Sequence, residues 1–475
     1  MALLETSFFS DRTTEDLYRY VQEVYKNYDY PWVIGYSGGK DSTATLQVIW
    51  NAIRDLPKED RTKKIFVIST DTLVETPVIV DYINDNLDRI NEAAKIQGLP
   101  FSAHKLSPAL QDTFWVNLIG KGYPAPNSNF RWCTDRMKIK PSNKFILEKA
   151  AEYGEVILAL GMRRGESNNR DKVMKSYRLK GHNLSRHSQL PGAWVFMPIE
   201  DFTINDVWTY LLQHTENGKS PWGGDNRSLS ALYRSAQEGE CPLVIDKTSP
   251  SCGNSRFGCW TCTVVARDKS MENMIDSGHE WMIPLLDFRD WLASTQSTED
   301  KASQREYKGR DGRVKVSKGG KLRYRTYKID FSKEMLKRLL ETQEEVQEHD
   351  PEFELISIQE LREIRKLWIS ERQDWQDSLP EIYESVVGKP LVKDFSDLPL
   401  PGMTELALLE ELSQKYDVPL RLPQKLLDAE WQTFGMFKRT KIHQTIDKIF
   451  NEDWRSLEDV QEDILEMEND ETNSQ

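Results

Sequence analysis

WVIGYSGGKDS, residues 32–42, is the stretch that decides the fold of this chain. An apolar run ends in a turn of small residues, and that turn leads directly into an amphipathic segment that predicts a helix. A strand–turn–helix junction of this kind points backbone N–H groups and the positive end of a helix dipole at one place, which suits a phosphate. Gly38 and Gly39 allow the backbone to approach an anion, and Lys40 adds positive charge.

The loop differs from a Walker A loop because its glycine-to-lysine spacing is one residue short and Asp41 stands in place of the Ser or Thr. Ser37 and Ser42 add two hydroxyl groups. The run SGGKDS resembles the PP-loop of the ATP pyrophosphatase superfamily, which binds the pyrophosphate part of ATP. A plain glycine turn is the alternative interpretation. The resemblance implies a site for ATP and Mg²⁺, with these residues as its cofactor-binding set: Ser37, Gly38, Gly39, Lys40, Asp41 and Ser42.

Length and composition narrow the class of protein. The chain has 475 residues, enough for two or three domains with a full core, and its net charge of −13 argues against a stand-alone nucleic-acid-binding protein. There is no basic-plus-apolar signal and no run of eighteen apolar residues, so we expect a soluble, cytoplasmic protein without membrane association. Four of the five cysteines lie within 241–262, which indicates a metal or redox site rather than a disulfide framework.

Apolar runs alternate with helical periodicity over the first 215 residues. The predicted strands are Trp32–Tyr36, Lys64–Ser69, Phe101–His104, Val156–Leu160 and Trp194–Met197. The predicted helices are 43–54, 77–97, 141–152 and 203–213, the last with Thr203 as its N-cap. This alternation predicts an α/β fold with a doubly wound, mainly parallel sheet and ligands at the carboxyl ends of the strands.

Four regions are expected along the chain: 1–215, the nucleotide-binding domain; 216–300, a cysteine-rich region; 301–330, a basic linker; and 331–475, a mostly helical, acidic region. Residues 301–328 carry eleven lysines and arginines against two acids, a local net charge of +9. This segment either contacts DNA phosphates or is a solvated linker that pairs with the acidic C-terminal helices. The acidic end, Glu466–Gln475, is expected to be disordered.

Further polar residues follow the predicted strands. Asp71 ends the second strand, where a ribose- or adenine-contacting residue or a simple turn would lie. Arg163, Arg164 and Arg170 follow the fourth strand, where they could clamp phosphates and stabilise developing charge, although alone they would suit a solvated surface. We therefore predict Arg163 and Arg164 as catalytic residues beside Lys40 and Asp41, and Asp71 and Arg170 as nucleotide-binding residues.

Cys133 lies in a segment that holds four basic residues and is expected to be a loop. Positive neighbours lower the pKa of a thiol and favour the reactive thiolate, so Cys133 is a candidate catalytic residue that handles sulfur. A buried, inert cysteine is the alternative. The order of these motifs resembles the PAPS reductase branch of the PP-loop superfamily over roughly residues 25–215. PAPS reductases carry a catalytic cysteine near the C-terminus, whereas this chain has none after Cys262.

The remaining cysteines have the spacing C-x10-C-x6-C-x2-C, and four thiolates of this kind suit either zinc or an iron–sulfur cluster. The segment 252–265 resembles the DndC family of bacterial DNA phosphorothioation proteins. That resemblance implies a [4Fe–4S] cluster, with Cys133 apart from it as the sulfur-handling thiol. A cluster with three cysteines, or with Cys133 as a ligand, remains an alternative. The implied metal ligands are Cys241, Cys252, Cys259 and Cys262.

The resemblance implies an ATP pyrophosphatase and sulfurtransferase that places sulfur in the DNA backbone. Adenylylation would turn a non-bridging phosphate oxygen into part of a good leaving group. A cysteine desulfurase would supply the sulfur, and other phosphorothioation proteins of the DndD and DndE types would be partners on the DNA substrate. Three other functions share these motifs: a PP-loop tRNA thiolase, a PAPS or APS reductase, and a non-catalytic scaffold that binds ATP and zinc.

Overall fold

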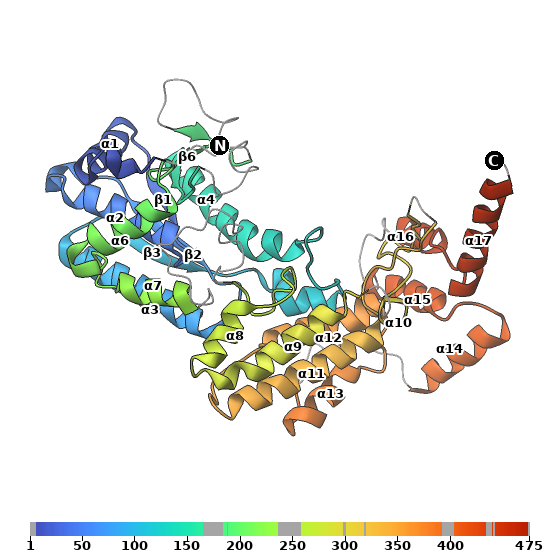
Figure 1. Cartoon of the computed structure of the whole chain (residues 1–475). Helices are drawn as coiled ribbons and strands as arrows, with labels where there is room; N and C mark the ends of the chain where they lie inside the picture. The colour runs from blue at the N-terminus through green and yellow to red at the C-terminus, as the bar shows by residue number, and fades with distance from the viewer. Residues whose placement is uncertain are drawn as a thin grey trace. The chain divides into compact units, whose positions relative to one another are not determined.

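The computed structural model describes residues 6–164, 184–187, 189–235, 258–297, 301–317, 320–391, 403–433, 439 and 442–473. The chain forms two compact units. Unit 1 consists of Met1–Ala109 and Asn127–Leu286, and unit 2 consists of Leu110–Pro126 and Asp287–Gln475. Figure 1 traces the elements of both units along the chain. The short segment 110–126 thus belongs with the C-terminal unit, although it lies between two strands of unit 1 in the sequence.

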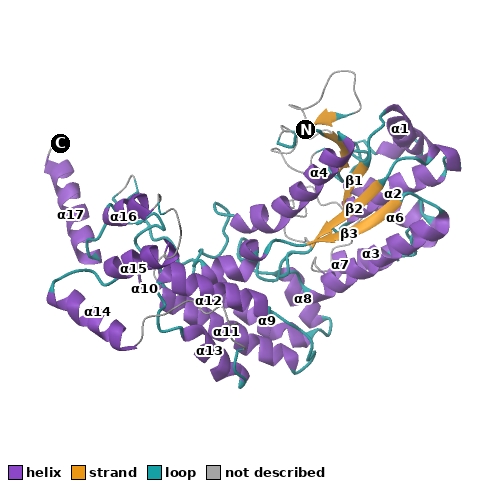
Figure 2. Cartoon of the chain, turned by 180° about the vertical axis from the view of Figure 1, so that it is seen from behind, coloured by secondary structure: helices purple, strands orange, loops and turns teal. Residues whose placement is uncertain are grey.

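Unit 1 is built on a six-stranded sheet with the order β3-β2-β1-β4-β6-β5 (Figure 2). Its strands are β1 (Trp32–Gly35), β2 (Ile65–Thr70), β3 (Phe101–Leu106), β4 (Val156–Ala159), β5 (Ser185–Arg186) and β6 (Ala193–Phe196). All neighbouring strands are parallel except β5, which is antiparallel to β6. The predicted α/β fold with a mainly parallel sheet is confirmed, and only the two-residue strand β5 was not predicted.

Helices occupy the connections between these strands. The α-helices of unit 1 are α1 (Thr14–Asn27), α2 (Lys40–Arg54), α3 (Pro77–Gln97), α4 (Lys140–Tyr153), α6 (Ile204–Gln213), α7 (Asn226–Ser235) and α8 (Lys269–Asp276). Thr203 caps α6 as predicted, because its hydroxyl accepts a hydrogen bond from the Asp206 N–H at 3.1 Å. The region after residue 216 is more helical than its Gly- and Pro-rich composition suggested, since α7 and α8 both lie there.

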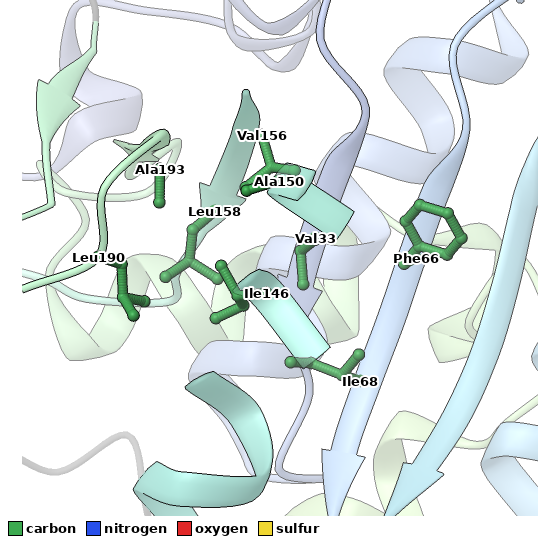
Figure 3. Packing of buried hydrophobic residues seen from close by; sticks show 9 residues of the cluster. All are labelled: Val33, Phe66, Ile68, Ile146, Ala150, Val156, Leu158, Leu190 and Ala193. Carbon is green, nitrogen blue, oxygen red and sulfur yellow. The ribbon is translucent and has the colours of Figure 1, made fainter. Parts of the chain in front are cut away.

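One face of the sheet packs against α4. Figure 3 shows Val33, Phe66 and Leu158 from neighbouring strands around Ile146 and Ala150 of α4, all of them buried. Successive residues along a strand point to opposite faces of the sheet, so the residues directly before and after Val33 point to the other face. Burial on both faces explains why β1, β2 and β4 read as continuous apolar runs rather than as alternating patterns.

The helix that follows the PP-loop lies on the opposite face and is buried nearly all round. Thirteen of the fifteen residues of α2 are buried, including Trp50 and Gln47. Trp32 of β1 packs on Tyr25 of α1 and Phe196 of β6, with ring centroids 5.8 and 5.3 Å apart. The start of α2 is therefore held by packing on several sides, which gives the loop before it a defined position.

Unit 2 is helical apart from short bridges. Its helices are α9 (Ile283–Ser294, which begins at the end of unit 1), α10 (Lys301–Gln304), α11 (Ile329–Gln347), α12 (Ile358–Arg372), α13 (Ser378–Val387), α14 (Met403–Lys415), α15 (Arg421–Thr433), α16 (Ile442–Phe450) and α17 (Leu457–Asn473). A π-helical turn, Val116–Gly120, packs into this unit, where the Trp368 indole donates to the Ile119 carbonyl at 3.0 Å. These long-range contacts assign residues 110–126 to unit 2.

The expectation of a disordered C-terminal end is corrected in part, because α17 continues through Asn473. Acids in its first turn, Glu458 and Asp459, lie at the positive end of the helix dipole and favour helix formation there. No helix in the described part of the chain is both long enough and apolar enough to cross a membrane.

Candidate functional site

The loop between β1 and α2 has the geometry that its sequence predicted. Gly38 has φ of +72°, and a side chain there would meet Ile83 at 3.1 Å, so both the backbone and the space require glycine. Gly39 is the N-cap residue of α2 and has no side chain to cap the first N–H groups, which follow directly on the turn after β1. A helix N-terminus at the carboxyl end of a central parallel strand is a suitable site for a phosphate.

Two serines shape this loop internally. The Ser42 hydroxyl donates to the Gly39 carbonyl at 2.9 Å and accepts from the Ser37 N–H at 3.2 Å. The hydroxyls of Ser37 and Ser42 lie 3.1 Å apart. Both predicted serines therefore hold the loop in its compact form.

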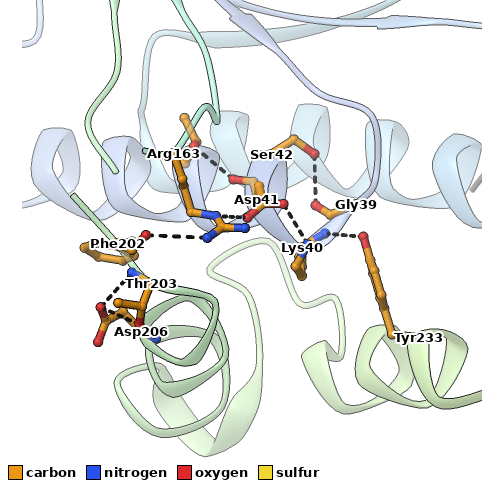
Figure 4. A network of polar contacts seen from close by, with 10 residues as sticks. Gly39, Lys40, Asp41, Ser42, Arg163, Phe202, Thr203, Asp206 and Tyr233 are labelled. Carbon is orange, nitrogen blue, oxygen red and sulfur yellow. Dashed lines mark hydrogen bonds and ion pairs between the residues drawn. The ribbon is translucent and has the colours of Figure 1, made fainter. Parts of the chain in front are cut away.

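Lys40, Asp41 and Arg163 form a partly buried charge network (Figure 4). The Lys40 ammonium lies 2.8 Å from one oxygen of Asp41, and the Arg163 Nε lies 2.6 Å from the other. Burial acts to raise the pKa of Asp41, but the charges of Lys40 and Arg163 outweigh it and hold that pKa below its ordinary value. Asp41 is therefore ionised, and it orients the two cations at the start of α2.

Arg163 reaches Asp41 because the chain after β4 passes unusually close to α2. A Cβ on Gly161 would lie 2.7 Å from the Asp41 carbonyl oxygen, so no larger residue fits there without a shift of the backbone. The guanidinium of Arg163 also donates to the Phe202 carbonyl at 3.5 Å. Gly161 was quoted in the sequence as part of an arginine-rich motif, but its role as a close-packing position became evident only from the structure.

Tyr233 of α7 is a site residue that sequence reasoning missed. Its hydroxyl accepts a hydrogen bond from the Lys40 N–H at 3.2 Å, and its ring lies beneath the Lys40 ammonium, 5.3 Å from the centroid (Figure 4). Tyr233 occupies one of the backbone N–H groups that would face a phosphate, so a ligand on this loop has to displace or include it. No local pattern connects Tyr233 with a loop almost two hundred residues earlier.

The other predicted nucleotide residues have different surroundings. Arg164 pairs with Glu200 at 3.2 Å and with Asp201 at 2.9 Å. Asp71 accepts from the Leu73 N–H at 2.8 Å and lies 3.5 Å from the Lys105 ammonium, as in a strand-end turn. Arg170 lies outside the described residues. The nucleotide roles of these three residues stay predictions.

A second group of reactive side chains gathers at the end of β2. Trp260 donates from its backbone N–H to the Val74 carbonyl at 3.0 Å, which holds the segment of Cys259 beside residues 72–76. The Cys259 sulfur lies 3.3 Å from the Thr72 hydroxyl, and the Cys262 N–H donates to the Cys259 carbonyl at 3.0 Å. The C-x2-C pair therefore forms a single tight turn.

Lys138 and Glu75 connect this turn with the segment of Cys133. The Lys138 ammonium lies 3.2 Å from a carboxylate oxygen of Glu75. Partial burial acts to lower the pKa of Lys138, but Cys259, Glu75 and Cys133 together raise it. A nearby cation stabilises whichever of the two thiols ionises. Lys138 was predicted as one of the four basic neighbours of Cys133, whereas Thr72 and Glu75 were not predicted as part of a thiol site.

The predicted low pKa of Cys133 is corrected. Burial raises the pKa of the Cys133 thiol, and repulsion from Cys262 raises it further. Burial also raises the pKa of Cys259, to about 12, against the opposing effect of Lys138. Cys133 does not lie in a loop either, because it directly precedes a π-helical turn, Thr134–Ile139, which leads into α4. Cys133 and Cys262 lie within electrostatic range of each other.

Two of the four predicted metal ligands, Cys241 and Cys252, lie outside the described residues. Among the residues that the structure describes, no three His, Cys, Asp or Glu side chains are arranged to hold a metal ion. The two remaining ligands, Cys259 and Cys262, lie in the same turn.

Comparison with known proteins agrees with this geometry. Residues 31–265 match the family described as the phosphoadenosine phosphosulfate reductase domain. This part of the chain is therefore similar to a PAPS reductase domain. The matched region contains the PP-loop, Arg163, Cys133 and the C-x2-C turn.

Two relatives come from the archaeon Methanocaldococcus jannaschii, and both are named as uncharacterized proteins. Uncharacterized protein MJ0066 is 26% identical over 194 residues, which are 41% of this chain and 34% of that protein. Uncharacterized protein MJ0973 is 27% identical over 189 residues, which are 40% of this chain and 38% of that protein. The match thus spans little more than a third of the length of either relative.

Proposed function

We propose that this protein uses ATP to place sulfur in the DNA backbone as a phosphorothioate. One observation carries the proposal: an ATP-type phosphate loop and a set of thiols lie at the same edge of one sheet. The loop follows β1, the thiol-holding residues Thr72 and Glu75 follow β2, and these strands are parallel neighbours. The Tyr36 N–H donates to the Ile68 carbonyl at 2.8 Å, so the strands stay paired up to the start of the loop.

The loop is suited to activating a phosphate rather than to transferring a terminal phosphoryl group. The N–H groups of α2 and the Lys40 ammonium bind the β- and γ-phosphates of ATP, and the ionised Asp41 would hold Mg²⁺, which supplies further neutralisation of their charge. A non-bridging oxygen of the DNA phosphate attacks the α-phosphorus, and pyrophosphate leaves. Arg163, anchored on Asp41, is the cation placed to stabilise charge that develops in this step.

Sulfur transfer then uses the thiols. A cysteine desulfurase delivers sulfur as the outer atom of a persulfide on Cys133, and that atom attacks the activated phosphorus while AMP leaves with the oxygen. A second thiol cleaves the S–S bond, which leaves sulfur on the DNA and a disulfide that an external dithiol reduces. The Lys138 charge beside Cys133 and Cys259 lowers the cost of forming the thiolates that these steps require.

The cysteine-rich segment would serve the same chemistry. Cys241, Cys252, Cys259 and Cys262 would hold a [4Fe–4S] cluster, which supplies electron-transfer or sulfur-binding chemistry when bound. The tight turn from Cys259 to Cys262 places two cysteines within four residues, a spacing that suits thiolate ligation. The proximity of Cys133 to Cys262 favours the alternative in which Cys133 belongs to the same centre.

The activity is tested by conversion of ATP to AMP and pyrophosphate and by phosphorothioate formation in DNA, with the full chain, a cysteine desulfurase and DndD- and DndE-type partners. Lys40→Ala should abolish both signals, and Cys133→Ser should abolish only sulfur incorporation. AMP formation that survives Lys40→Ala would contradict the nucleotide half of the proposal. Iron and sulfide content of the anaerobic protein, compared with a Cys259→Ser, Cys262→Ser variant, tests the cluster.

A PAPS or APS reductase is the second candidate, because the match to the PAPS reductase domain favours it directly. Here the thiol attacks the sulfur of an adenylyl sulfate instead of receiving sulfur from a desulfurase. Release of sulfite from adenylyl sulfate with a dithiol reductant, and no phosphorothioate in DNA, would select this function over the first.

A further inference from the structure

The basic segment of unit 2 contains a two-stranded antiparallel ribbon. Residues 315–317 pair with 321–323 through a bridge between Val316 and Leu322. The Ser317 N–H donates to the Lys321 carbonyl and the Arg323 N–H to the Lys315 carbonyl, both at 2.9 Å. The backbone positions that carry the charged side chains are therefore set relative to one another.

The pairing sorts the ribbon into two faces. Side chains two residues apart share a face, and so do residues directly opposite across the ribbon. Lys315 and Arg323 are opposite each other, and Arg313 and Lys321 lie on the same face. We call this set the basic face: Arg313, Lys315, Lys321 and Arg323, with Arg325 next in the same period. The first four are exposed, whereas Val314, Leu322 and Tyr324 of the other face are half-buried.

The basic face has little compensation from carboxylates. Among the described residues its one ion pair joins Lys315 and Asp311 at 3.5 Å, both half-exposed. Like charges directly opposite each other on a ribbon are unfavourable. Repulsion between Lys315 and Arg323 therefore lowers the stability of the ribbon, and an anionic partner would relieve this repulsion.

Other cationic side chains of the basic segment bind partners within unit 2. Arg305 is buried and donates to the Thr295 carbonyl at 2.8 Å, and Arg310 pairs with Glu371 of α12. Glu306 of this segment pairs with Arg421 of α15 at 2.8 Å. The first part of the segment thus follows the linker interpretation and pairs with the C-terminal helices, whereas the described side chains of the basic face form no ion pair with the described part of those helices.

We propose that the basic face of the ribbon binds the phosphate backbone of double-stranded DNA. A two-stranded ribbon is narrow enough to enter a major groove, and several cations on one face match the charge of a phosphate row. Contacts of this kind position the protein on DNA without reading its sequence. The inference rests on the proposed function, in which DNA is the substrate. It names the surface of the protein that binds this DNA.

The test measures binding of the full chain to a plain DNA duplex across a range of salt concentrations. The variant Lys321→Ala, Arg323→Ala should reduce the salt slope by about 2, at about 0.9 per phosphate contact, and lower the affinity on the order of 10- to 100-fold near 0.1 M salt. The matched control is Lys337→Ala, Lys366→Ala, which removes the same charge from exposed positions on α11 and α12. The control should leave the slope within about 0.5.

An unchanged slope in the ribbon variant, an equal loss in the control, or equal competition by polyglutamate would each overturn the inference. Its failure can be distinguished from that of the proposed function. Ribbon variants should bind ATP normally, so normal ATP binding with lost DNA binding supports the inference even if no phosphorothioate forms. Phosphorothioate formation together with unchanged DNA binding by the ribbon variant would uphold the function and refute the inference.

Discussion

The PP-loop of unit 1 and the ribbon of unit 2 hold their positive charges in opposite ways. At the PP-loop, Lys40 and Arg163 are buried and share one carboxylate, Asp41. On the ribbon, Arg313, Lys321 and Arg323 are exposed and, within the described chain, have no carboxylate partner. Buried charges require a partner and are thereby oriented, whereas exposed charges can remain uncompensated and available. The first arrangement suits chemistry at defined atoms, and the second suits binding along an extended anion.

We expect the largest effect from a substitution in the buried charge network of the PP-loop. Asp41→Asn removes the only charge between two buried cations and should destabilise unit 1 by about 3–5 kcal/mol and abolish ATP turnover. Urea denaturation and an AMP assay measure the two effects. Asp201→Asn is the matched control, since it removes a half-exposed partner of Arg164 and should cost at most about 1 kcal/mol. Similar losses in both variants would refute the distinction.

A smaller effect tests the close approach that brings Arg163 to Asp41. Gly161→Ala places a Cβ 2.7 Å from the Asp41 carbonyl oxygen and should destabilise unit 1 by about 1–3 kcal/mol while lowering ATP turnover more than tenfold. Gly35→Ala is the control, because its nearest neighbour, Leu160, lies at an ordinary 3.5 Å. Full activity of Gly161→Ala would show that the network tolerates a shift.

The pH dependence of stability should distinguish Asp41, a carboxylate with two cationic partners, from Asp428, a buried carboxylate that accepts a hydrogen bond from an amide. Burial raises the pKa of Asp428 to about 6, although a hydrogen bond from Gln373 at 3.1 Å opposes the shift. A raised folded pKa means that stability is lost as pH rises from 3.8 through about 6. Asp428→Asn should therefore be more stable than the wild type at pH 7, by about 1–2 kcal/mol after allowance for partial solvent screening.

The contribution of Asp41 to stability depends on pH with the opposite sign. Because its folded pKa lies below the ordinary 3.8, its contribution to stability is present above pH 3.8 and is lost as pH falls below that value. Urea midpoints between pH 3 and pH 7 should show the difference between wild type and Asp428→Asn growing with pH, and that between wild type and Asp41→Asn shrinking at the acidic end. Parallel curves for all three proteins would contradict both assignments.

The smallest effect concerns the ribbon. Arg323→Glu places a carboxylate opposite Lys315 and should stabilise unit 2 by about 0.2–1 kcal/mol while weakening DNA binding. Hydrogen exchange of the ribbon amides and a DNA titration measure the two changes. Lys337→Glu on α11, with the same change in charge, should leave both nearly unchanged. A ribbon that loses stability on this substitution would mean that its cations are already compensated.

Much of unit 1 could be predicted because its elements depend on near neighbours. The apolar run at residues 32–36 and the capping pair Thr203 and Asp206 each carry their signal within a few residues. Strand β5 escaped prediction because two residues are too short to establish a pattern. The C-terminal end was expected to be disordered because of its charge, yet α17 continues through Asn473. The acids in the first turn of this helix lie at the positive end of its dipole.

The sequence by itself determined the parallel α/β sheet, the PP-loop with its glycines, and the clustering of the cysteines, since these follow from local periodicity and residue chemistry. Only the tertiary structure decided which side chains meet. It joined Arg163 to Asp41, brought Tyr233 to Lys40, and paired Lys138 with Glu75. It also raised the pKa of Cys133 where its basic neighbours in sequence predicted the opposite. The physical reason is that burial and charge act through space, at distances that residue numbers do not express.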